Sequence, residues 1–345
     1  MTTAIRLRHI SIKDYKGIDH LELDFPVPDL PGDPDVIVIG SENGLGKTSV
    51  LECCAFVLLR PKFVTTQTKP YSLSEYLNLL IRAGASQAEI IGKLHDDTQI
   101  VLRIGRNKVF FEGTDGTGGF FCPSSVPVRR SRTNVSQRDT IGNILGHSSD
   151  PVIENELVFF HSYRKIHEGN LQAKALFKNV TTNALSNIFK RTAMFLMMSN
   201  AGLFDSPQNP DDAQKTLDKL DNLLSQYAGC RFAKLRPTEN DNLEFRVQPT
   251  GGGDSFNFDA LSSGQKEIIT TLFLIWYETR NQSKVVLIDE PELHLNSQWH
   301  RSFVNSLIEL APQNQYIIAT HSATIMDSVN RNRRILLQND KETVQ

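Results

Sequence analysis

The stretch VIVIGSENGLGKTSVLECCAF, residues 36–56, most narrowly constrains how this chain can fold. Its first five residues predict a short strand that is buried on both faces. A glycine-containing loop follows, and a helix is predicted from Lys47 onward. A phosphate site requires this order of strand, loop and helix, because glycines let backbone N–H groups turn inward around an anion. The sequence therefore predicts a phosphate-binding loop.

The loop fits the pattern G-x-x-x-x-G-K-[ST] in its second half, at Gly46, Lys47 and Thr48. Ser41 stands at the first glycine position, and Gly40 comes one residue early. In such loops the lysine neutralises phosphate charge and the hydroxyl is a ligand of Mg²⁺. The predicted nucleotide-binding residues of the loop are Ser41, Glu42, Asn43, Gly44, Leu45, Gly46, Lys47, Thr48 and Ser49.

Two further apolar runs end in polar residues suited to phosphate chemistry. VVLIDE, 285–290, places Asp289 and Glu290 at the carboxyl end of a buried strand, where open α/β sheets bind ligands. We expect Asp289 to hold Mg²⁺, and Glu290 to accept a proton from an attacking water. YIIATHS, 316–322, ends on His321, which we expect to contact the γ-phosphate. The alternatives are an acidic surface turn and a structural histidine.

The stretch ALSSGQKEIITTLFLIWY, 260–277, predicts a buried helix with a polar start. Ser262 as N-cap and Gln265 three residues later fit the capping-box pattern. A helix start of this kind offers free N–H groups and a favourable dipole to an anion. Because the first loop already holds the phosphates of one nucleotide, we expect this helix to face the nucleotide of a second copy of the chain.

The other segments alternate between strand and helix patterns, which favours an α/β fold. Residues 4–25 predict two strands joined by a turn, and 88–112 an antiparallel meander. The segment 113–139 is rich in Gly and Ser and then basic, and is expected to be a mobile loop. No sustained heptads occur, so we expect no long coiled coil. The expected regions are a first lobe at 1–160, a helical insertion at 161–235, and a second lobe at 236–345.

Composition excludes several classes of protein. With 37 Lys+Arg and 39 Asp+Glu the net charge is −2, without the basic excess that drives nonspecific binding to nucleic acid. The four cysteines form no C-x-x-C pair, which indicates a reduced cytoplasmic protein without a zinc or redox motif. The charged N-terminus does not resemble a signal peptide, and no apolar run approaches the roughly 20 residues of a membrane span.

Four motifs in a fixed order make the sequence resemble the ABC-class ATPases. SENGLGKT, LSSGQKE, VVLIDEPELHL and THS are similar to the Walker A motif, the signature, Walker B with the D-loop, and the H-loop. The residues of these motifs are most similar to the RecF/SMC/OLD-like branch of AAA family ATPases. The resemblance covers about 1–60, less clearly 88–165, and firmly 256–325. It implies an ABC/SMC-type P-loop NTPase head with a mixed β-sheet lobe, which binds and hydrolyses ATP with Mg²⁺.

The resemblance also implies an ATP-sandwich dimer, in which Lys47 and Thr48 of one copy face the signature of the other. Ser263 stands where transporters usually have glycine. Lys16, in DYKG, matches a basic position near the nucleotide in relatives, and a solvated turn lysine is the alternative. No Q-loop glutamine is identified. The signature residues expected to bind nucleotide are Ser262, Ser263, Gly264 and Gln265, and the expected catalytic residues are Glu290, His321 and Lys47.

Three functions remain open. The first is an ATP-hydrolysing switch that forms a homo-oligomer and regulates a separate effector, a nuclease or toxin, in anti-phage defence. Stand-alone heads of this kind resemble the ATPase components of Septu, PARIS and some retron systems. The second is a RecF-like repair ATPase that binds DNA, and the third is an ATP-bound scaffold that sequesters a toxin or nuclease. The basic residues that could serve DNA binding, with a solvated loop as the alternative, are Arg129, Arg130, Arg132 and Arg138.

Two spacings narrow these functions further. The segment between Thr48 and Ser262 is far longer than transporter ATPases need, so a transport subunit is disfavoured. Related nucleases of the OLD type append a Toprim domain after the H-loop. If the chain is complete, too few residues follow His321 for such a domain, and we expect no nuclease within it.

Overall fold

The computed structural model divides into two compact units. The first contains residues 1–163, 281–293 and 297–345, and the second contains 164–280 and 294–296. The residues that the structure describes are 4–41, 44–59, 77–106, 108–121, 144–145, 151–162, 171–172, 185–201, 210–238 and 242–338.

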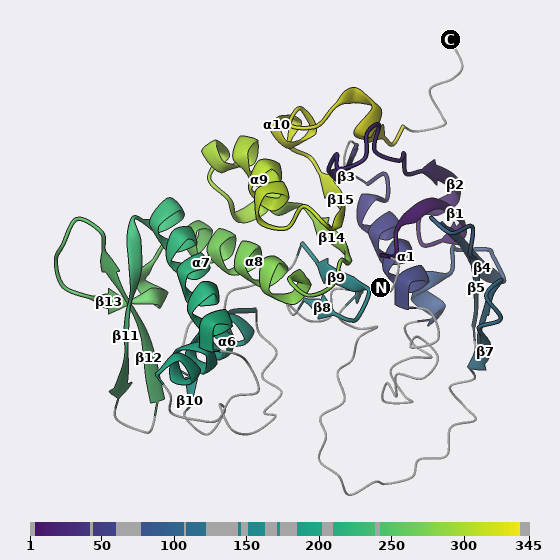
Figure 1. The fold of residues 1–345 in the computed structure, drawn as a ribbon. Coiled ribbons are helices and arrows are strands. Elements are labelled where there is room, and N and C mark those ends of the chain that lie inside the picture. Colours follow the sequence, from purple (N-terminus) through teal and green to yellow (C-terminus); the bar gives the residue numbers. More distant parts are fainter. Residues whose placement is uncertain are drawn as a thin grey trace, which may run out of the picture. The chain divides into compact units, whose positions relative to one another are not determined.

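An antiparallel sheet with the strand order β2-β1-β4-β5-β6-β7 forms one layer of the first unit (Figure 1). Inward and outward residues alternate along it, as the period of a half-buried strand requires. This pairing confirms the predicted two-strand turn at 4–25 and the meander at 88–112. Its strands are β1 (Leu7–Tyr15), β2 (Ile18–Asp24), β4 (Gln87–Leu94), β5 (Gln99–Gly105), β6 (Lys108–Gly113) and β7 (Gly118–Phe121).

Strand β7 corrects the prediction that all of 113–139 is a mobile loop. Its four residues pair with β6, with Val109 opposite Phe121. An open strand edge supplies hydrogen-bond partners that a local composition pattern does not reveal, so a glycine-rich segment can still form a strand. The remainder of that segment, from 122 to 139, lies outside the described residues.

A second sheet, with the order β16-β3-β15-β14-β9-β8, forms another layer of this unit. Strands β3, β14 and β15 are buried at every position, which suits parallel strands covered on both faces. All its pairs are parallel except β8 with β9. The carboxyl ends of the parallel strands therefore meet at one edge. The strands are β3 (Asp35–Gly40), β8 (Val152–Ile153), β9 (Leu157–Phe160), β14 (Val285–Asp289), β15 (Gln315–Thr320) and β16 (Arg334–Leu336).

Helix α1 (Lys47–Leu59) lies between the two sheets (Figure 1). It contacts β1 and β4 of the antiparallel sheet, and β14 and β15 of the parallel one. A helix covered in this way has no polar face, and nearly all of its residues are buried. Further helical segments are α9 (Ser297–Leu310), α10 (Ala323–Met326) and η4 (Arg331–Arg333) in this unit, and η3 (Pro291–His294), whose last residue is assigned to the second unit.

The units differ from the predicted regions 1–160, 161–235 and 236–345. Residues 281–293 and 297–345 belong with the N-terminal part of the chain. The physical reason is strand pairing, since β14 and β15 insert between β3 and β9 of the parallel sheet. Residues 236–280 instead continue the second unit.

In the described residues of the second unit, a small antiparallel sheet occurs together with helices α6, α7 and α8. The sheet has the order β10-β12-β11, and β13 also pairs with β12. Helices α6, α7 and α8 pack on one another, and α7 is the longest described helix, with 19 residues. Its elements are β10 (Leu171–Gln172), α6 (Leu185–Asn200), α7 (Pro210–Ala228), β11 (Cys230–Thr238), β12 (Asn242–Pro249), β13 (Phe256–Asn257), η2 (Phe258–Ala260) and α8 (Ser263–Thr279).

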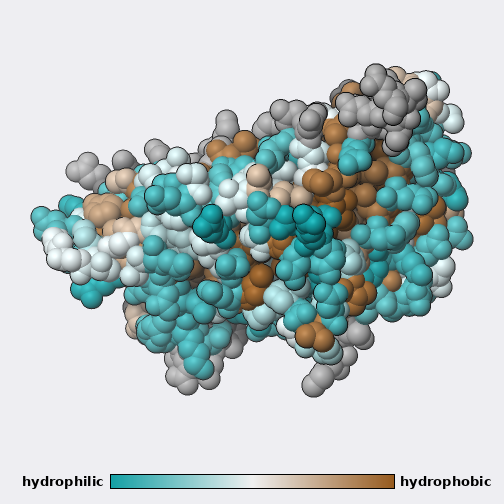
Figure 2. All heavy atoms as spheres, turned by 90° about the horizontal axis from the view of Figure 1, so that it is seen from above, coloured by the Kyte–Doolittle hydropathy of each residue, from teal (hydrophilic) through white to brown (hydrophobic). Residues whose placement is uncertain are grey.

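On the face shown in Figure 2, apolar residues gather in separate patches between larger hydrophilic areas. Among the described residues, no helix is both long and apolar enough to span a bilayer. The large apolar side chains with the greatest exposure are Leu79, Leu30, Val27 and Leu336.

Candidate functional site

The predicted phosphate loop joins the end of β3 to the start of α1. Gly44 and Gly46 have φ values of +83° and +87°, in the left-handed region that glycine adopts without strain. A Cβ atom on Gly46 would also approach Ile18 Cγ1 to 3.1 Å. Ser41 is not among the described residues with positive φ, so a serine is accepted where the motif has its first glycine. Glu42 and Asn43 lie outside the described residues.

Lys47, the first residue of α1, is buried, and its ammonium contacts the loop and the end of β15. Nζ lies 2.9 Å from Ser41 Oγ and 2.8 Å from His321 Nε2. Burial lowers the pKa of Lys47, and the negative charges of Glu290 and Asp289 oppose that shift. The loop therefore holds the positive charge of Lys47 at the position where the phosphates of a nucleotide are expected.

Thr48 and Asp289 meet beside this lysine. Thr48 Oγ1 donates a hydrogen bond of 2.9 Å to Asp289 Oδ2, and Asp289 is fully buried at the end of β14. A hydroxyl and a carboxylate are hard oxygen ligands of the kind Mg²⁺ prefers. The described residues contain no group of three or more His, Cys, Asp or Glu side chains able to hold a metal. This donor set fits Mg²⁺, which takes few protein ligands and fills its shell with water and substrate phosphates.

Glu290 follows β14 with a φ of +44°, a conformation that is uncommon for a residue with a side chain. Its backbone N–H donates to Ala319 O, which ties the turn to β15. Its Oε1 lies 3.1 Å from His321 Nε2. Backbone strain of this type is often found at functional sites, where the surrounding contacts maintain it.

His321 Nε2 contacts two groups of opposite charge. It lies 2.8 Å from Lys47 Nζ and 3.1 Å from Glu290 Oε1. A ring nitrogen either accepts a hydrogen bond from an ammonium or donates one to a carboxylate. The backbone N–H of His321 donates to Glu292 Oε1, which anchors the histidine to η3. Lys47, His321 and Glu290 therefore form one coupled set.

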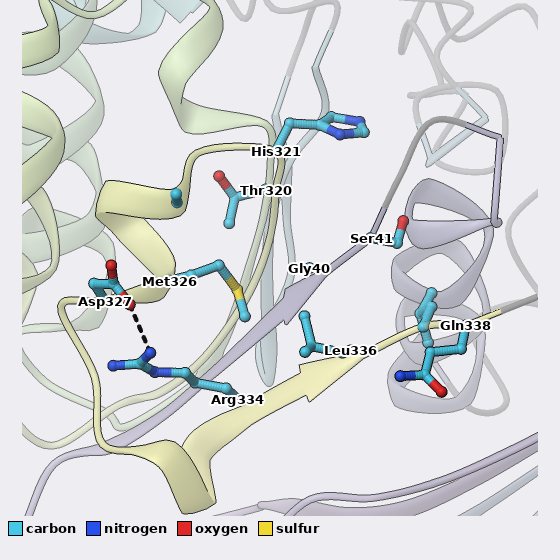
Figure 3. Close-up of a pocket in the computed structure, with 11 residues that line it drawn as sticks. Gly40, Ser41, Thr320, His321, Met326, Asp327, Arg334, Leu336 and Gln338 are labelled. Atoms are coloured by element: carbon cyan, nitrogen blue, oxygen red, sulfur yellow. Dashed lines mark hydrogen bonds and ion pairs between the residues drawn. The ribbon is translucent and has the colours of Figure 1, made fainter.

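A cavity of about 570 Å³ adjoins the loop on the side of β16 (Figure 3). The ion pair between Arg334 and Asp327, 2.6 Å long, forms part of its wall. Ser41 and His321 line it, whereas Lys47 does not. The cavity therefore lies next to the set formed by Lys47, His321 and Glu290 and does not enclose it.

The predicted signature residues belong to the second unit, at the start of α8. Gln265 N donates to Ser262 Oγ at 3.3 Å, and Ser262 N donates to Gln265 Oε1 at 3.0 Å. These two bonds confirm the predicted capping box. Ser262 and Ser263 are exposed, and Gly264 and Gln265 are half-buried.

Lys16 contacts α1. Its Nζ lies 2.6 and 2.7 Å from the carboxylate oxygens of Glu52, a buried residue one turn beyond Thr48. The hydroxyl of Tyr15 donates to the same carboxylate at 2.9 Å. The contact of Lys16 with a nucleotide stays a prediction. The arginines considered for DNA binding, between 129 and 138, lie outside the described residues.

His161 is a candidate that the sequence motifs did not include. It is buried directly after β9, and the pairing of Phe160 with Ile288 sets it beside the end of β14. Its Nδ1 lies 3.3 Å from Ser162 Oγ. The signal that could have found it is a polar residue at the end of an apolar strand, as for Asp289 and His321.

Sequence comparisons match the chain to a family model and to known proteins. The family model described as "AAA domain, putative AbiEii toxin, Type IV TA system" matches residues 150–327. The Septu protein PtuA of Bacillus mycoides (strain KBAB4) is 22% identical over 346 residues. The match covers 97% of this chain and 41% of that protein, so the chain spans about two fifths of its relative's length.

Two similar solved structures are SMC head domains. One is an SmcHead bound to the C-winged helix domain of ScpA, with a TM-score of 0.50 and 16% identity. The other is the Smc head domain with an extended coiled coil bound to the C-terminal domain of ScpA from Pyrococcus furiosus, with a TM-score of 0.51 and 14% identity. Each match covers 94% of this chain and 92% of the other. At this level of identity the likeness establishes the fold alone.

Proposed function

Because this chain belongs to the AAA domain family described as putative AbiEii toxin, Type IV TA system, and has an ABC/SMC-type P-loop NTPase fold, we propose that it hydrolyses ATP. The observation that carries this proposal is the meeting of three strand ends. The ends of β3, β14 and β15 bring a buried lysine, a hydroxyl, two carboxylates and an imidazole to one edge of the parallel sheet. Phosphoryl transfer needs this combination, since its catalysis consists of positioning and charge stabilisation.

We assign the binding roles to Lys47, Thr48 and Asp289. Lys47 neutralises the β- and γ-phosphates, and the loop N–H groups around Gly44 and Gly46 cradle them. The Thr48 hydroxyl and the Asp289 carboxylate hold Mg²⁺, which neutralises charge on the phosphate oxygens when bound. Their 2.9 Å contact supports this assignment, because one ion can reach both oxygens.

We assign the chemical roles to Glu290 and His321. Glu290 accepts the proton of the attacking water, and His321 contacts the γ-phosphate. The pairing of both residues at 3.1 Å supports this division, since it orients the carboxylate beside the imidazole. When phosphate takes the place of His321 at Lys47, His321 Nε2 becomes available to a phosphate oxygen.

We further propose that two copies enclose ATP between them. The start of α8, with Ser262, Ser263, Gly264 and Gln265, then binds the nucleotide held by the loop of the partner copy. The exposure of Ser262 and Ser263 supports this, because a helix start covered by its own chain could not reach a second molecule.

For the biological role, we propose regulation of a separate effector, a nuclease or toxin, in cytoplasmic anti-phage defence. The similarity to a Septu protein over 97% of this chain supports the defence role.

Measuring ATP turnover in Lys47→Ala and Glu290→Gln tests the proposal. ATP turnover is expected to fall about 100-fold or more in both variants, because general-base and charge-stabilising groups contribute rate effects of this order. Lys47→Ala is also expected to lose ATP binding, whereas Glu290→Gln retains it and accumulates an ATP-bound dimer of twice the 38.8 kDa chain mass.

Lys93→Ala and Glu22→Gln are matched controls, since both residues are exposed on the antiparallel sheet. These controls are expected to hydrolyse ATP like the wild type. Unchanged turnover in both Lys47→Ala and Glu290→Gln would contradict ATP hydrolysis at this site. ATP binding without turnover in the wild type would instead favour an ATP-bound scaffold.

A further inference from the structure

The second unit contains a buried ion pair just before the start of α8. Lys190 Nζ, on α6, lies 2.6 and 2.7 Å from the two carboxylate oxygens of Asp259, in η2. The side chain of Lys190 is 3% exposed and that of Asp259 is 15% exposed. Removing an ammonium from water is costly unless the partner geometry is good, so a pair this buried restricts where its two segments can lie.

Asp259 is held at its backbone as well. Its N–H donates to Asn257 Oδ1 at 2.9 Å, and its carbonyl oxygen accepts from Lys266 Nζ at 2.9 Å. Lys266 is buried and lies on α8, only four residues after Ser262. Asp259 therefore links η2 both to α6 and to the start of α8.

An aromatic contact runs beside the ion pair. The rings of Phe189, next to Lys190, and Phe258, next to Asp259, lie 5.2 Å apart and are fully buried. Phe273 of α8 also packs on Phe189, at 5.4 Å. The same two segments are thus joined by an apolar and a charged contact, and a shift of α6 would carry η2 with it.

We infer that Lys190 is a positioning residue for the signature end of α8. Through Asp259 it fixes Ser262 and the residues that follow relative to α6. ATP-dependent dimerisation and ATP turnover therefore require α6 in the position that it has in this structure. This inference rests on the proposed function of the α8 start. Positioning matters here because displacing a reacting group by about 1 Å can cost about 100-fold in rate.

Lys190→Met removes the charge with little change in side-chain length, and Lys215→Met is its matched control on an exposed site of α7. Turnover, and dimerisation in a Glu290→Gln background, are expected to fall about 10- to 100-fold in Lys190→Met. Binding of a fluorescent ATP analogue to the loop around Lys47 is expected to stay within about two-fold. Lys215→Met is expected to match the wild type in each measurement.

Two further variants separate positioning from general stability. Asp259→Asn is expected to reproduce the loss, since it removes the opposite charge. Lys190→Arg keeps the charge and is expected to restore most of the turnover. If ATP binding by Lys190→Met falls as much as its ATP turnover, the ion pair contributes to the stability of the whole chain. That result overturns the inference.

Hydrogen exchange gives a readout that does not depend on hydrolysis. Amides of 258–266 are expected to exchange faster in Lys190→Met than in Lys215→Met, while those of the loop at 44–49 stay unchanged. Equal exchange in both variants overturns the inference. A wild-type chain that neither dimerises nor hydrolyses ATP would instead overturn the proposed function.

Discussion

Burial decides which single residues of this chain can react. Cys53 and Cys54 have no exposed area on α1, and desolvation raises the pKa of both thiols above the usual range. Burial also raises the pKa of the Cys230 thiol. The thiolate is the reactive form, so these cysteines pack as small apolar side chains rather than act as nucleophiles.

Thiol labelling at pH 8 checks this conclusion. In a Cys122→Ser background, the three remaining thiols are expected to react slowly with a disulfide reagent while the protein is folded. A raised pKa leaves little thiolate at that pH, and burial also limits access. All three are expected to react promptly in denaturant. Fast labelling of any of them in the folded protein would show that α1 or the start of β11 opens readily.

At the level of elements, α1 depends on close approach to both sheets. Gly92 of β4 faces Val57 of α1, and a Cβ at Gly92 would lie 2.4 Å from Val57 Cγ1. Real Cβ atoms do not come so close, so glycine at this position lets the strand and the helix pack in contact.

Gly92→Ala is therefore expected to lower the free energy of unfolding by about 1–3 kcal/mol, as overpacking a core does. Urea denaturation measures this change. Gly17→Ala is the control, because a Cβ there meets nothing within 4 Å and the residue is exposed. It is expected to change stability by no more than about 0.5 kcal/mol. Equal effects of the two substitutions would argue against tight packing between α1 and β4.

At the level of the whole molecule, the two halves of the proposed ATP site come from different units of the chain. The loop and strand ends around Lys47 belong to the first unit, and the start of α8 to the second. If two copies enclose ATP, each site uses the first unit of one copy and the second unit of the other. A substitution in the first unit and a substitution in the second unit then disable different halves of the site, and the two can be placed in different copies of a dimer.

Mixing two inactive variants tests this arrangement. Lys47→Ala disables the loop and Ser262→Arg blocks the start of α8, so each variant alone is expected to be inactive. In a mixed dimer, both defects fall in one site and the other site is intact. An equal mixture is expected to recover up to about a quarter of wild-type turnover, from the statistics of symmetric pairing. No recovery, with both variants folded, would count against sites shared between copies.

Local sequence patterns determined the elements that depend on near neighbours. Four buried runs became strands β3, β9, β14 and β15, because apolar side chains at successive positions need cover on both faces. The capping box at Ser262 spans only three residues and was equally visible. The ABC-like fold was expected from the resemblance of four motifs to that class, and the position of Asp289 and His321 at strand ends followed from the apolar runs before them.

Only the tertiary structure decided contacts between residues far apart in the chain. In the folded chain, residues 281–293 and 297–345 belong to the first unit. Lys16 pairs with Glu52, and Lys190 pairs with Asp259. No local pattern specifies these partners, because a charged side chain looks the same in sequence whether it meets water or another charge. Burial and strand pairing depend on the assembled sheets and helices, and these select the partner once the chain has folded.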